Sequence, residues 1–386
     1  MDTSSAAAHE AWRRKYDGPK FEQPLTSLDD TGPFKLGRKL GEGGWGNVYR
    51  TELDGVVVAL KLLHLFPNKQ RDLYVNELKI LQKLSGTRHR HVVELIGCFE
   101  LIGRLRSRIG LLIWPVAQCD LSGMLHYMDI LSGLKARLIQ FPNSTNVSEL
   151  LDEEESDALN ILSAITTPAR QEDRWSLPQD LLSRVQLILD ACKDRLYAAF
   201  GCLAHAISYL HNDQRIRHRD VNPKQILLSS HGVWLTDFGV SKDISDASGS
   251  STNNGERYSA KYHAPERESK GELPCGRAED IFALGCTYLE MWYAVCGVSV
   301  DDYLNAQGER QWSYQANLHQ TDDWLEPLMV AYTTTRWALL LAMLLKRMMA
   351  REPQTRPRSE EVAQLLKVID SMKSYKVFGD CCRPGT

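Results

Sequence analysis

His218-Arg219-Asp220 and, further along the chain, Asp237-Phe238-Gly239 are the two stretches that decide the interpretation of this sequence. Either tripeptide alone would arise by chance in many proteins. Their order, and the further motifs that precede and follow them, make coincidence a poor explanation.

A glycine-rich segment upstream, Gly41-Glu42-Gly43-Gly44-Trp45-Gly46-Asn47-Val48, has the spacing G-x-G-x-x-G-x-V. Alone it would also fit a dinucleotide-binding fold or an ordinary hairpin turn. Residues 34–40 and 48–53 are predicted strands, and no helix follows the glycines, whereas a dinucleotide fingerprint needs one. The pattern therefore predicts two strands joined by a turn whose missing Cβ atoms let backbone N–H groups approach phosphates.

The next two segments supply a cation and a carboxylate. Val58-Ala59-Leu60-Lys61 lies in the apolar run 56–63, which predicts a buried strand whose lysine either reaches solvent or serves a site. Residues 70–84 have the apolar spacing of a helix and include Glu77. A charged residue on a helix is usually only solvated, so Glu77 alone proves nothing.

Taken in order, these motifs resemble those of the protein kinase family, with Ser/Thr specificity favoured. The resemblance implies an α+β, two-lobed fold: a small antiparallel-sheet lobe with one helix and a larger helical lobe. It also implies ATP and Mg²⁺ as cofactors, with Mn²⁺ as an alternative metal, and a protein substrate. Asp220 would accept the hydroxyl proton, Asp237 and Gln225 would hold metal, and Lys61, fixed by Glu77, would hold phosphates.

The same resemblance implies the nucleotide contacts. Ile113 would be the gatekeeper, the Trp114 carbonyl and the Val116 N–H would bond adenine, and Asp120 would bond ribose. The full expected set is Leu40, Gly41, Glu42, Gly43, Gly44, Trp45, Gly46, Val48, Ala59, Lys61, Ile113, Trp114, Val116, Asp120 and Leu227.

Downstream motifs extend the resemblance to about residue 370. Ala264-Pro265-Glu266 would close an activation segment that begins at Val240, and Asp280 would open a buried helix. Arg356, in Pro353-Gln354-Thr355-Arg356-Pro357, would form a buried ion pair with Glu266; the alternative is two unrelated surface charges.

The catalytic loop departs from the family pattern, which reads H-R-D-L-K-P-x-N. Asn222 replaces the usual Lys, a cation returns at Lys224, and Gln225 replaces the metal-binding Asn. Ser259 lies where Ser/Thr kinases carry a hydroxyl that contacts this loop, although the position of Lys224 is that of the Arg in many tyrosine kinases. Three hypotheses follow: an active protein kinase, a nucleotide-binding scaffold of low or no activity, and a small-molecule kinase, against which Glu266 and Arg356 argue.

Composition excludes several other classes. The formal charge of −3 gives no general attraction to nucleic acid or membranes, and no apolar run reaches the ~18 residues of a membrane helix. The nine cysteines are scattered and the N-terminus lacks a signal-peptide pattern, which favours reduced thiols and an intracellular location, cytoplasmic or nuclear.

The expected domains are a flexible extension over 1–33, a small lobe over 34–116, a large lobe over 117–372 and a mobile tail over 373–386. The helix 196–211 would precede the catalytic loop, which leaves 122–194 with a long, partly disordered insertion. Its acidic run, residues 152–157, is either a solvated surface or a docking site for a basic partner; charge runs are usually solvated.

Overall fold

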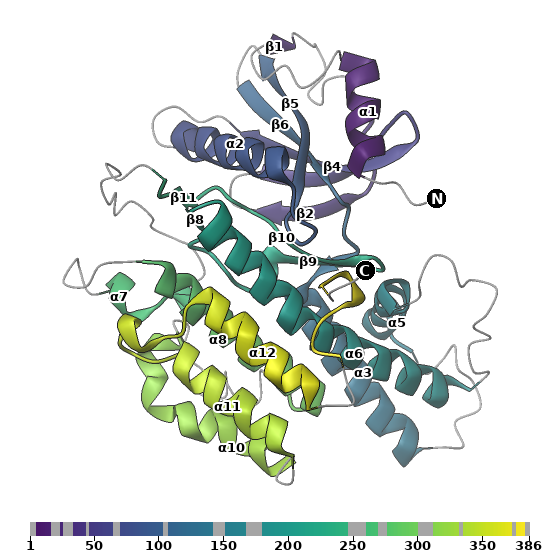
Figure 1. Ribbon diagram of the computed structural model, residues 1–386. Coiled ribbons are helices and arrows are strands. Elements are labelled where there is room, and N and C mark those ends of the chain that lie inside the picture. Colours follow the sequence, from purple (N-terminus) through teal and green to yellow (C-terminus); the bar gives the residue numbers. More distant parts are fainter. Residues whose placement is uncertain are drawn as a thin grey trace. The chain divides into compact units, whose positions relative to one another are not determined.

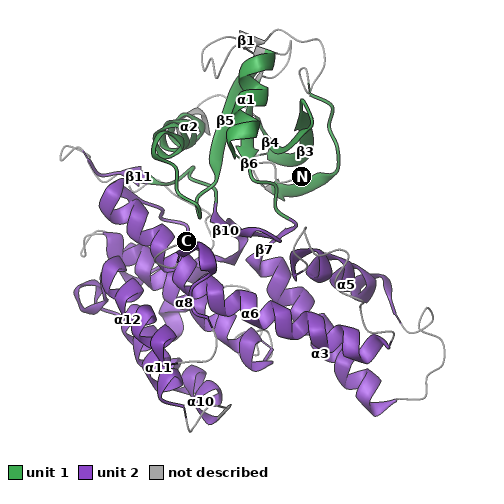
Figure 2. Cartoon of the chain, turned by 45° about the vertical axis from the view of Figure 1, so that its right-hand side comes forward, with its two compact units in different colours: residues 1–117, 236–241 green, residues 118–235, 242–386 purple. Residues whose placement is uncertain are grey.

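The computed structural model describes residues 5–16, 24–25, 34–43, 46–64, 70–102, 107–141, 151–166, 180–245, 260–268, 276–299, 312–331, 335–372 and 376–382. The chain forms two compact units (Figure 2). Unit 1 comprises residues 1–117 and 236–241, and unit 2 comprises residues 118–235 and 242–386. This division confirms the two-lobed fold expected from the sequence.

Unit 1 is built on a six-stranded sheet with the order β1-β5-β6-β4-β3-β2 (Figure 1). Its strands are β1 (Pro24–Leu25), β2 (Lys39–Gly43), β3 (Gly46–Leu53), β4 (Val56–His64), β5 (Glu94–Ile102) and β6 (Ser107–Trp114). All pairs are antiparallel except β1 with β5. The segment 34–37, expected to be extended strand, is irregular, and β2 begins only at Lys39.

The side chains of strand β4 show that the two faces of this sheet have different contacts. Val58, Leu60 and Leu62 belong to an apolar cluster with the helix α1 (Ser5–Tyr16). Side chains alternate along a strand, so Ala59 and Lys61 point to the opposite face. The helix α2 (Gln70–Thr87) supplies Glu77 to Lys61 on that face.

Helix α1 corrects part of one expectation, since residues 5–16 of the extension expected to be flexible over 1–33 form a packed helix. Its Trp12 packs so closely on Gly97 that an added Cβ there would lie 2.2 Å from the ring. Trp12 also stacks with Phe34, which stacks with Phe99. A helix of this length is not stable alone, because forming it costs conformational entropy. The burial of large apolar side chains such as Trp12 against the sheet compensates for that cost.

A polar contact fixes the same helix at its N-terminal end. The carboxylate of Glu94 accepts a hydrogen bond from Ser5 and lies 3.3 Å from Nε2 of His9 and 3.5 Å from Nε of Arg88. Burial by itself would raise the pKa of Glu94, but these partners lower it below its ordinary value. Glu94 is therefore the charged anchor of α1.

Unit 2 is mainly helical. Its long helices are α3 (Leu121–Gln140), α5 (Glu153–Thr166), α6 (Leu181–Ser208), α8 (Arg277–Cys296), α10 (Thr321–Ala331), α11 (Arg336–Met348) and α12 (Ser359–Ser371). The short helical turns are η1 (Tyr209–Asp213), η2 (Pro223–Gln225), η3 (Ala260–Tyr262), α7 (Pro265–Glu268), η4 (Gln315–Gln320), η5 (Pro353–Thr355) and η6 (Asp380–Cys382). Its strands are β7 (Cys119–Asp120), β8 (Ile216–Arg217), β9 (Ile226–Ser229), β10 (Gly232–Leu235) and β11 (Lys242–Asp243). None of the described helices combines the length and apolar character needed to cross a membrane.

Helices α6 and α8 form the core of unit 2. Helix α6 begins at Leu181, fifteen residues before the helix start expected at Leu196, so part of the expected insertion belongs to it. Most of α8 is buried, including Trp292 and Tyr293, which are fully inaccessible. Gly285 lets α11 approach α8, since an added Cβ would lie 2.9 Å from Cβ of Met348.

The acidic run of the insertion is not a merely solvated loop. Asp152 accepts from the N–H of Glu155 at 2.8 Å and Glu155 accepts from the N–H of Asp152 at 3.2 Å, which is a reciprocal helix cap. Glu155 is buried and receives a hydrogen bond of 2.8 Å from Arg137 on α3. The run therefore starts helix α5, which packs on α3 and α6; residues 142–150 and 167–179 lie outside the described chain.

Candidate active site

The glycine-rich segment carries the end of one strand and the start of the next in unit 1, as expected. Gly41 and Gly43 lie in β2 and Gly46 begins β3; Gly44 and Trp45 lie outside the described residues. A Cβ on Gly46 would lie 2.0 Å from the carbonyl oxygen of Leu62, so only glycine allows β3 to pair with β4 at this point. Glu42 accepts a hydrogen bond from Lys39, and Leu40 lies between Lys39 and Gly41, where the β2–β3 register shifts.

Strand register places the expected nucleotide contacts of unit 1 on one face. Lys61 pairs with Val48 on β3, and Ala59 pairs with Ile113 on β6. Residues opposite each other on neighbouring strands share a face, as do residues two apart on one strand. Val48, Ala59, Lys61 and Ile113 therefore line the same side of the sheet. Strand β6 ends at Trp114, and Val116 follows it in the predicted hinge.

Lys61 lies between two carboxylates of unit 1. Its Nζ is 2.7 Å from Oε1 of Glu77 and 3.2 Å from Oδ1 of Asp237. Burial alone would lower the pKa of Lys61, but the charges of Asp237 and Glu77 outweigh it and raise the pKa above its ordinary value. Lys61 therefore stays charged at neutral pH, with its ammonium held beside the Asp237 carboxylate.

The segment that carries Asp237 is fixed by a residue that the sequence analysis left without a role. Nδ2 of Asn76, next to Glu77 on α2, donates to the carbonyl oxygens of Gly239 at 3.1 Å and Ser241 at 2.8 Å. Asp237 adopts a φ of +61°, a backbone conformation that is uncommon for non-glycine residues. Helix α2 thus positions both the lysine partner and the acidic loop.

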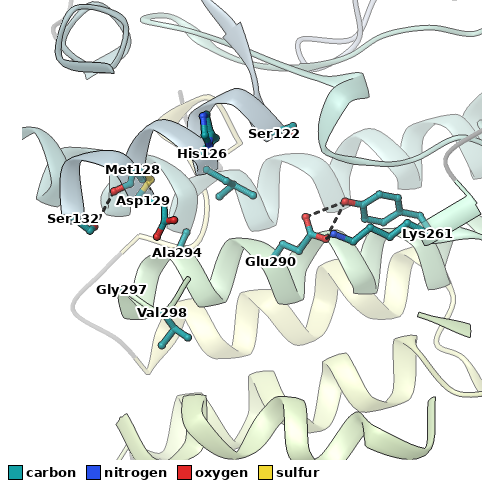
Figure 3. Close-up of a pocket in the computed structure, with 12 residues that line it drawn as sticks. Ser122, His126, Met128, Asp129, Ser132, Lys261, Glu290, Ala294, Gly297 and Val298 are labelled. Atoms are coloured by element: carbon teal, nitrogen blue, oxygen red, sulfur yellow. Dashed lines mark hydrogen bonds and ion pairs between the residues drawn. The ribbon is translucent and has the colours of Figure 1, made fainter. Parts of the chain in front are cut away.

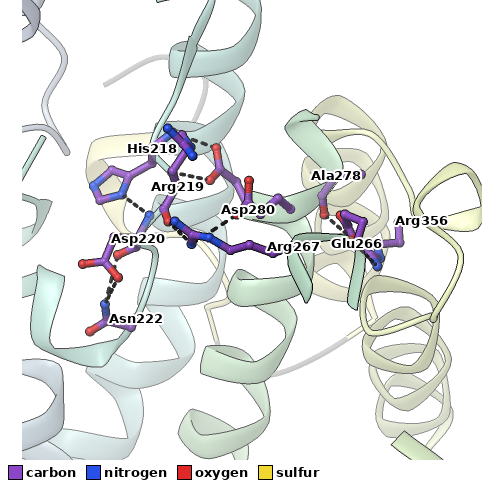
Figure 4. Close-up of polar contacts among 10 residues, drawn as sticks. His218, Arg219, Asp220, Asn222, Glu266, Arg267, Ala278, Asp280 and Arg356 are labelled. Atoms are coloured by element: carbon purple, nitrogen blue, oxygen red, sulfur yellow. Dashed lines mark hydrogen bonds and ion pairs between the residues drawn. The ribbon is translucent and has the colours of Figure 1, made fainter. Parts of the chain in front are cut away.

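In unit 2, the loop around Asp220 is held by the buried carboxylate of Asp280 on α8 (Figure 4). Oδ2 accepts from the N–H of His218 at 2.8 Å and contacts Nε2 of His211 at 2.8 Å; Oδ1 accepts from the N–H of Arg219 at 2.7 Å. Burial by itself raises the pKa of Asp280, but these bonds lower it. The sequence predicted Asp280 at the start of this helix but not its partner His211.

The Asp220 side chain is held by the two residues that depart from the family pattern. Nδ2 of Asn222 lies 3.0 Å from Oδ1 of Asp220, and Nε2 of Gln225 lies 3.3 Å from Oδ2. Asp220 is buried, so these two amides fix its carboxylate. Lys224, the alternative cation of this loop, is exposed.

Asp120 and Leu227 are neighbours in unit 2, paired across β7 and β9. The Asp120 carboxylate caps helix α3 by accepting from the N–H of Gly123 at 2.7 Å. Burial raises the pKa of Asp120, and the Gly123 bond and the charge of Lys224 oppose that rise. Asp120 thus has a structural role besides the ribose contact that the sequence predicts.

The expected ion pair of Arg356 and Glu266 is present and fully buried. The two guanidinium nitrogens of Arg356 lie 2.7 and 2.8 Å from the two carboxylate oxygens of Glu266 (Figure 4). Next to it, Arg267 donates to the carbonyl oxygen of Arg219 at 3.0 Å and lies 3.2 Å from Glu279. Arg267 therefore links the catalytic loop, through Arg219, to helix α8, through Glu279. The sequence pattern did not indicate this role, although Arg267 directly follows Glu266.

A cavity of about 260 Å³ opens in unit 2 between α3, α8 and the segment 260–262 (Figure 3). Ser122, His126 and Asp129 line it from α3, and Glu290 from α8. The Glu290 carboxylate is already bound by Lys261 at 2.9 Å and by the hydroxyls of Tyr262 and Tyr314. Of the two carboxylates that line the cavity, Glu290 is buried and Asp129 is exposed. Asp129 accepts a hydrogen bond from Ser299 at 3.4 Å.

A family model described as "Protein tyrosine and serine/threonine kinase" matches residues 34–366. The chain belongs to the protein kinase family.

Several plant kinases are similar to this kinase. It is 30% identical over 280 residues to L-type lectin-domain containing receptor kinase IX.2 of Arabidopsis thaliana, which covers 71% of this chain and 31% of that protein. It is 25% identical over 372 residues to Receptor-like serine/threonine-protein kinase NCRK of the same plant, covering 91% and 54%. It is 26% identical over 294 residues to PTI1-like tyrosine-protein kinase 1, covering 74% and 64%. The chain spans less than two thirds of the length of each of these relatives.

Part of the predicted site of this kinase lies outside the described residues. Ser259, the residue that favoured Ser/Thr over Tyr specificity, is among them, together with residues 246–258 of the activation segment. The described ends of that segment are Ser245 and the turn η3.

Proposed function

We propose that this protein kinase transfers the γ-phosphoryl group of ATP to a Ser or Thr hydroxyl of a protein substrate. The observation that supports activity most directly is the Lys61 ammonium, which lies 2.7 Å from Glu77 and 3.2 Å from Asp237. A lysine placed in this way presents a fixed positive charge to phosphate oxygens, and phosphoryl transfer depends chiefly on positioning and charge neutralisation.

Each unit contributes part of the chemistry. Unit 1 would hold the α- and β-phosphates through Lys61 and contribute the Asp237 carboxylate to a metal. Unit 2 would supply Asp220, which orients the substrate hydroxyl and accepts its proton. Asn222 and Gln225 hold that carboxylate in one orientation, which favours a defined approach of the hydroxyl.

The donor groups present suit a hard divalent cation. A carboxylate from Asp237 and an amide oxygen from Gln225 are the oxygen ligands that Mg²⁺ and Mn²⁺ accept. Because Nε2 of Gln225 donates to Asp220, the amide oxygen is the atom left for a metal. The bound cation would neutralise phosphate charge.

The cavity of Figure 3 is a candidate contact for a side chain of the protein substrate. It lies against η3, close to the end of the activation segment, and it is polar and open enough for a side chain. The exposed Asp129 favours a basic or hydroxyl-bearing residue of a substrate there.

A nucleotide-binding scaffold is the second candidate. The observation that favours it is the hydrogen bond from Gln225 to Asp220. An amide that is held by the catalytic carboxylate is less able to move its oxygen into position to coordinate a metal. In that case the chain would bind ATP but turn it over slowly or not at all.

A radiolabelled ATP assay with generic Ser/Thr and Tyr substrates tests the proposal. We expect transfer to Ser/Thr substrates, with a loss of several decades in the Lys61→Ala variant and none in Lys79→Ala, an exposed lysine of the same unit. Equal turnover by the wild type and Lys61→Ala would refute the role of Lys61. Nucleotide binding without turnover by the wild type would support the scaffold instead.

A further inference from the structure

We propose that Cys202, Cys381 and Cys382 form a zinc-binding site in unit 2 that fastens the C-terminal segment to helix α6. These three residues are far apart in the sequence and belong to no C-x-x-C pair. The fold nevertheless brings their Sγ atoms within 4.8 Å of one another.

Residues 376–382, the described part of the tail that the sequence predicts to be mobile over 373–386, are docked on unit 2. The N–H of Gly201 on α6 donates to the carbonyl oxygen of Val377 at 2.9 Å, and the N–H of Val377 donates to Asp370 at 2.6 Å. The Phe378 ring lies over Gly201, where a Cβ would come within 2.3 Å of it. The turn η6 contacts α6 and lies beside it near the C label of Figure 1. The backbone of η6 is therefore placed by contacts that do not involve the thiols.

The sulfur positions fit a tetrahedral metal site better than a disulfide. Sγ of Cys202 lies 3.7 Å from Sγ of Cys381. Two sulfurs bound at ~2.3 Å to one tetrahedral Zn²⁺ are separated by about 3.8 Å, whereas a disulfide bond is ~2.05 Å long. Three thiolates are soft ligands, which select zinc over Mg²⁺ or Ca²⁺.

Gly379 keeps the space between the sulfurs open. A Cβ at this position would lie 3.0 Å from Sγ of Cys381 and 3.2 Å from Sγ of Cys202. Any other residue would push on the two sulfur atoms that the metal must bridge. The glycine has an ordinary backbone conformation, so the close approach to sulfur, and not a turn requirement, accounts for it.

A nearby cation balances the charge that the loaded site would carry. Three thiolates and one Zn²⁺ carry a net charge of −1, and the guanidinium of Arg195 on α6 interacts electrostatically with Cys202 and Cys381. Arg195 is itself held by the carbonyl oxygens of Ser229 and Ser230. The site therefore has a fixed countercharge, and a fourth ligand would complete its tetrahedral set.

Such a site would be structural. Helix α6 continues through η1 and β8 into His218, so a metal that ties η6 to α6 would stabilise the helix leading to the catalytic loop. Cys202 is buried, which agrees with a role in holding the fold and not in reactive thiol chemistry.

The test is the zinc content of the full chain, purified without added metal and dialysed. We expect about one zinc per chain, and X-ray absorption with about three sulfurs at ~2.3 Å. Cys382→Ser and Cys202→Ser should bind zinc at least about 100-fold more weakly in competition with a chromogenic chelator, because outer-shell changes alone cost ~10–100-fold. Cys296→Ser, a half-buried cysteine at the end of α8, is the matched control and should bind as the wild type does.

Gly379→Ala provides a second variant, in which all three thiols remain. We expect its zinc affinity to fall about 10-fold, and chelation to lower the Tm of the wild type but not of Cys382→Ser. Because Cys382 is half-exposed, its variant should fold even if Cys202→Ser does not. The proposal is overturned by dialysed wild type that lacks zinc and takes up none, by a Cys202–Cys381 disulfide in the native protein, or by equal zinc loss in Cys296→Ser.

Discussion

Replacing Arg356 with methionine should strongly destabilise unit 2. Both members of the Arg356–Glu266 pair have 0% side-chain exposure, so the variant leaves the Glu266 carboxylate in the core without a cation. Arg356 also donates to the carbonyl oxygens of Ala350, Ala278 and Arg351 at 2.8–3.0 Å, and these lose their donor as well. Breaking a buried pair on one side costs ~3–5 kcal/mol in free energy of unfolding.

That loss can be converted into a melting temperature. A change of 1 kcal/mol shifts Tm by about 2–4 °C for proteins of 150–250 residues, and the shift is smaller for longer chains. With about 2 °C per kcal/mol, the loss of ~3–5 kcal/mol corresponds to a decrease in Tm of about 6–10 °C. The matched control is Lys346→Met, which removes a cation 2.5 Å from Asp322 where both side chains are more than half exposed. Exposed pairs contribute ~0–1 kcal/mol, so the control should change Tm by about 2 °C or less.

Calorimetry or urea titration measures both variants, and a double variant separates charge from packing. Glu266→Leu combined with Arg356→Met should recover part of the loss, because an apolar replacement of both partners removes the unpaired charge. If Arg356→Met is no less stable than Lys346→Met, the buried pair is not what stabilises this part of unit 2.

Three further predictions concern the small sheet, the metal and the activation segment. The pKa of Glu94 is lowered in the folded state, so its stabilising contribution is present above its ordinary pKa of 4.5 and is lost as the pH falls through the folded value. The hydrogen-exchange protection factors of residues 5–16 should therefore fall at acid pH in the wild type and depend less on pH in Glu94→Gln. The wild type should prefer Mn²⁺ to Mg²⁺, and Gln225→Asn should reduce that preference; identical metal titrations of ATP turnover for both proteins would contradict the role of Gln225. Phosphorylation of the activation segment should raise activity through Arg219, so complete phosphatase treatment should lower turnover, and unchanged activity would contradict this. The candidate hydroxyls are Ser245 and, outside the described residues, Ser248, Ser250, Ser251 and Thr252.

The sequence predicted the elements that local residue patterns determine, such as glycine positions, apolar runs and helical spacing. The glycine segment predicted two consecutive strands, and β2 and β3 confirm them. The apolar run 56–63 predicted β4, and the helical spacing of 70–84 predicted α2. The Glu266–Arg356 pair was implied by the resemblance to the kinase family, and it is present.

The remaining features depend on contacts between distant segments. Helix α1 has only Ala8, Ala11 and Trp12 as buried apolar residues, a pattern too short to stand out before the sheet that it covers is known. The acidic start of α5 looked solvated because the partner of Glu155, Arg137, lies on another helix. The roles of Asn76 and His211 were missed because their partners lie 165 and 69 residues away in sequence.

Helix α1 also determines at which residue a stable fragment of this protein can begin. The kinase family match begins at Phe34, so a fragment started there would look complete by sequence comparison. It would lack Trp12 and would leave Val58, Leu60, Leu62 and Phe99 without their cover. An uncovered apolar surface of that kind promotes aggregation of an expressed fragment. The stable folding unit of this kinase therefore starts at least as early as Ser5, and a poorly behaved fragment from Phe34 would reflect a misplaced cut, not an unstable kinase.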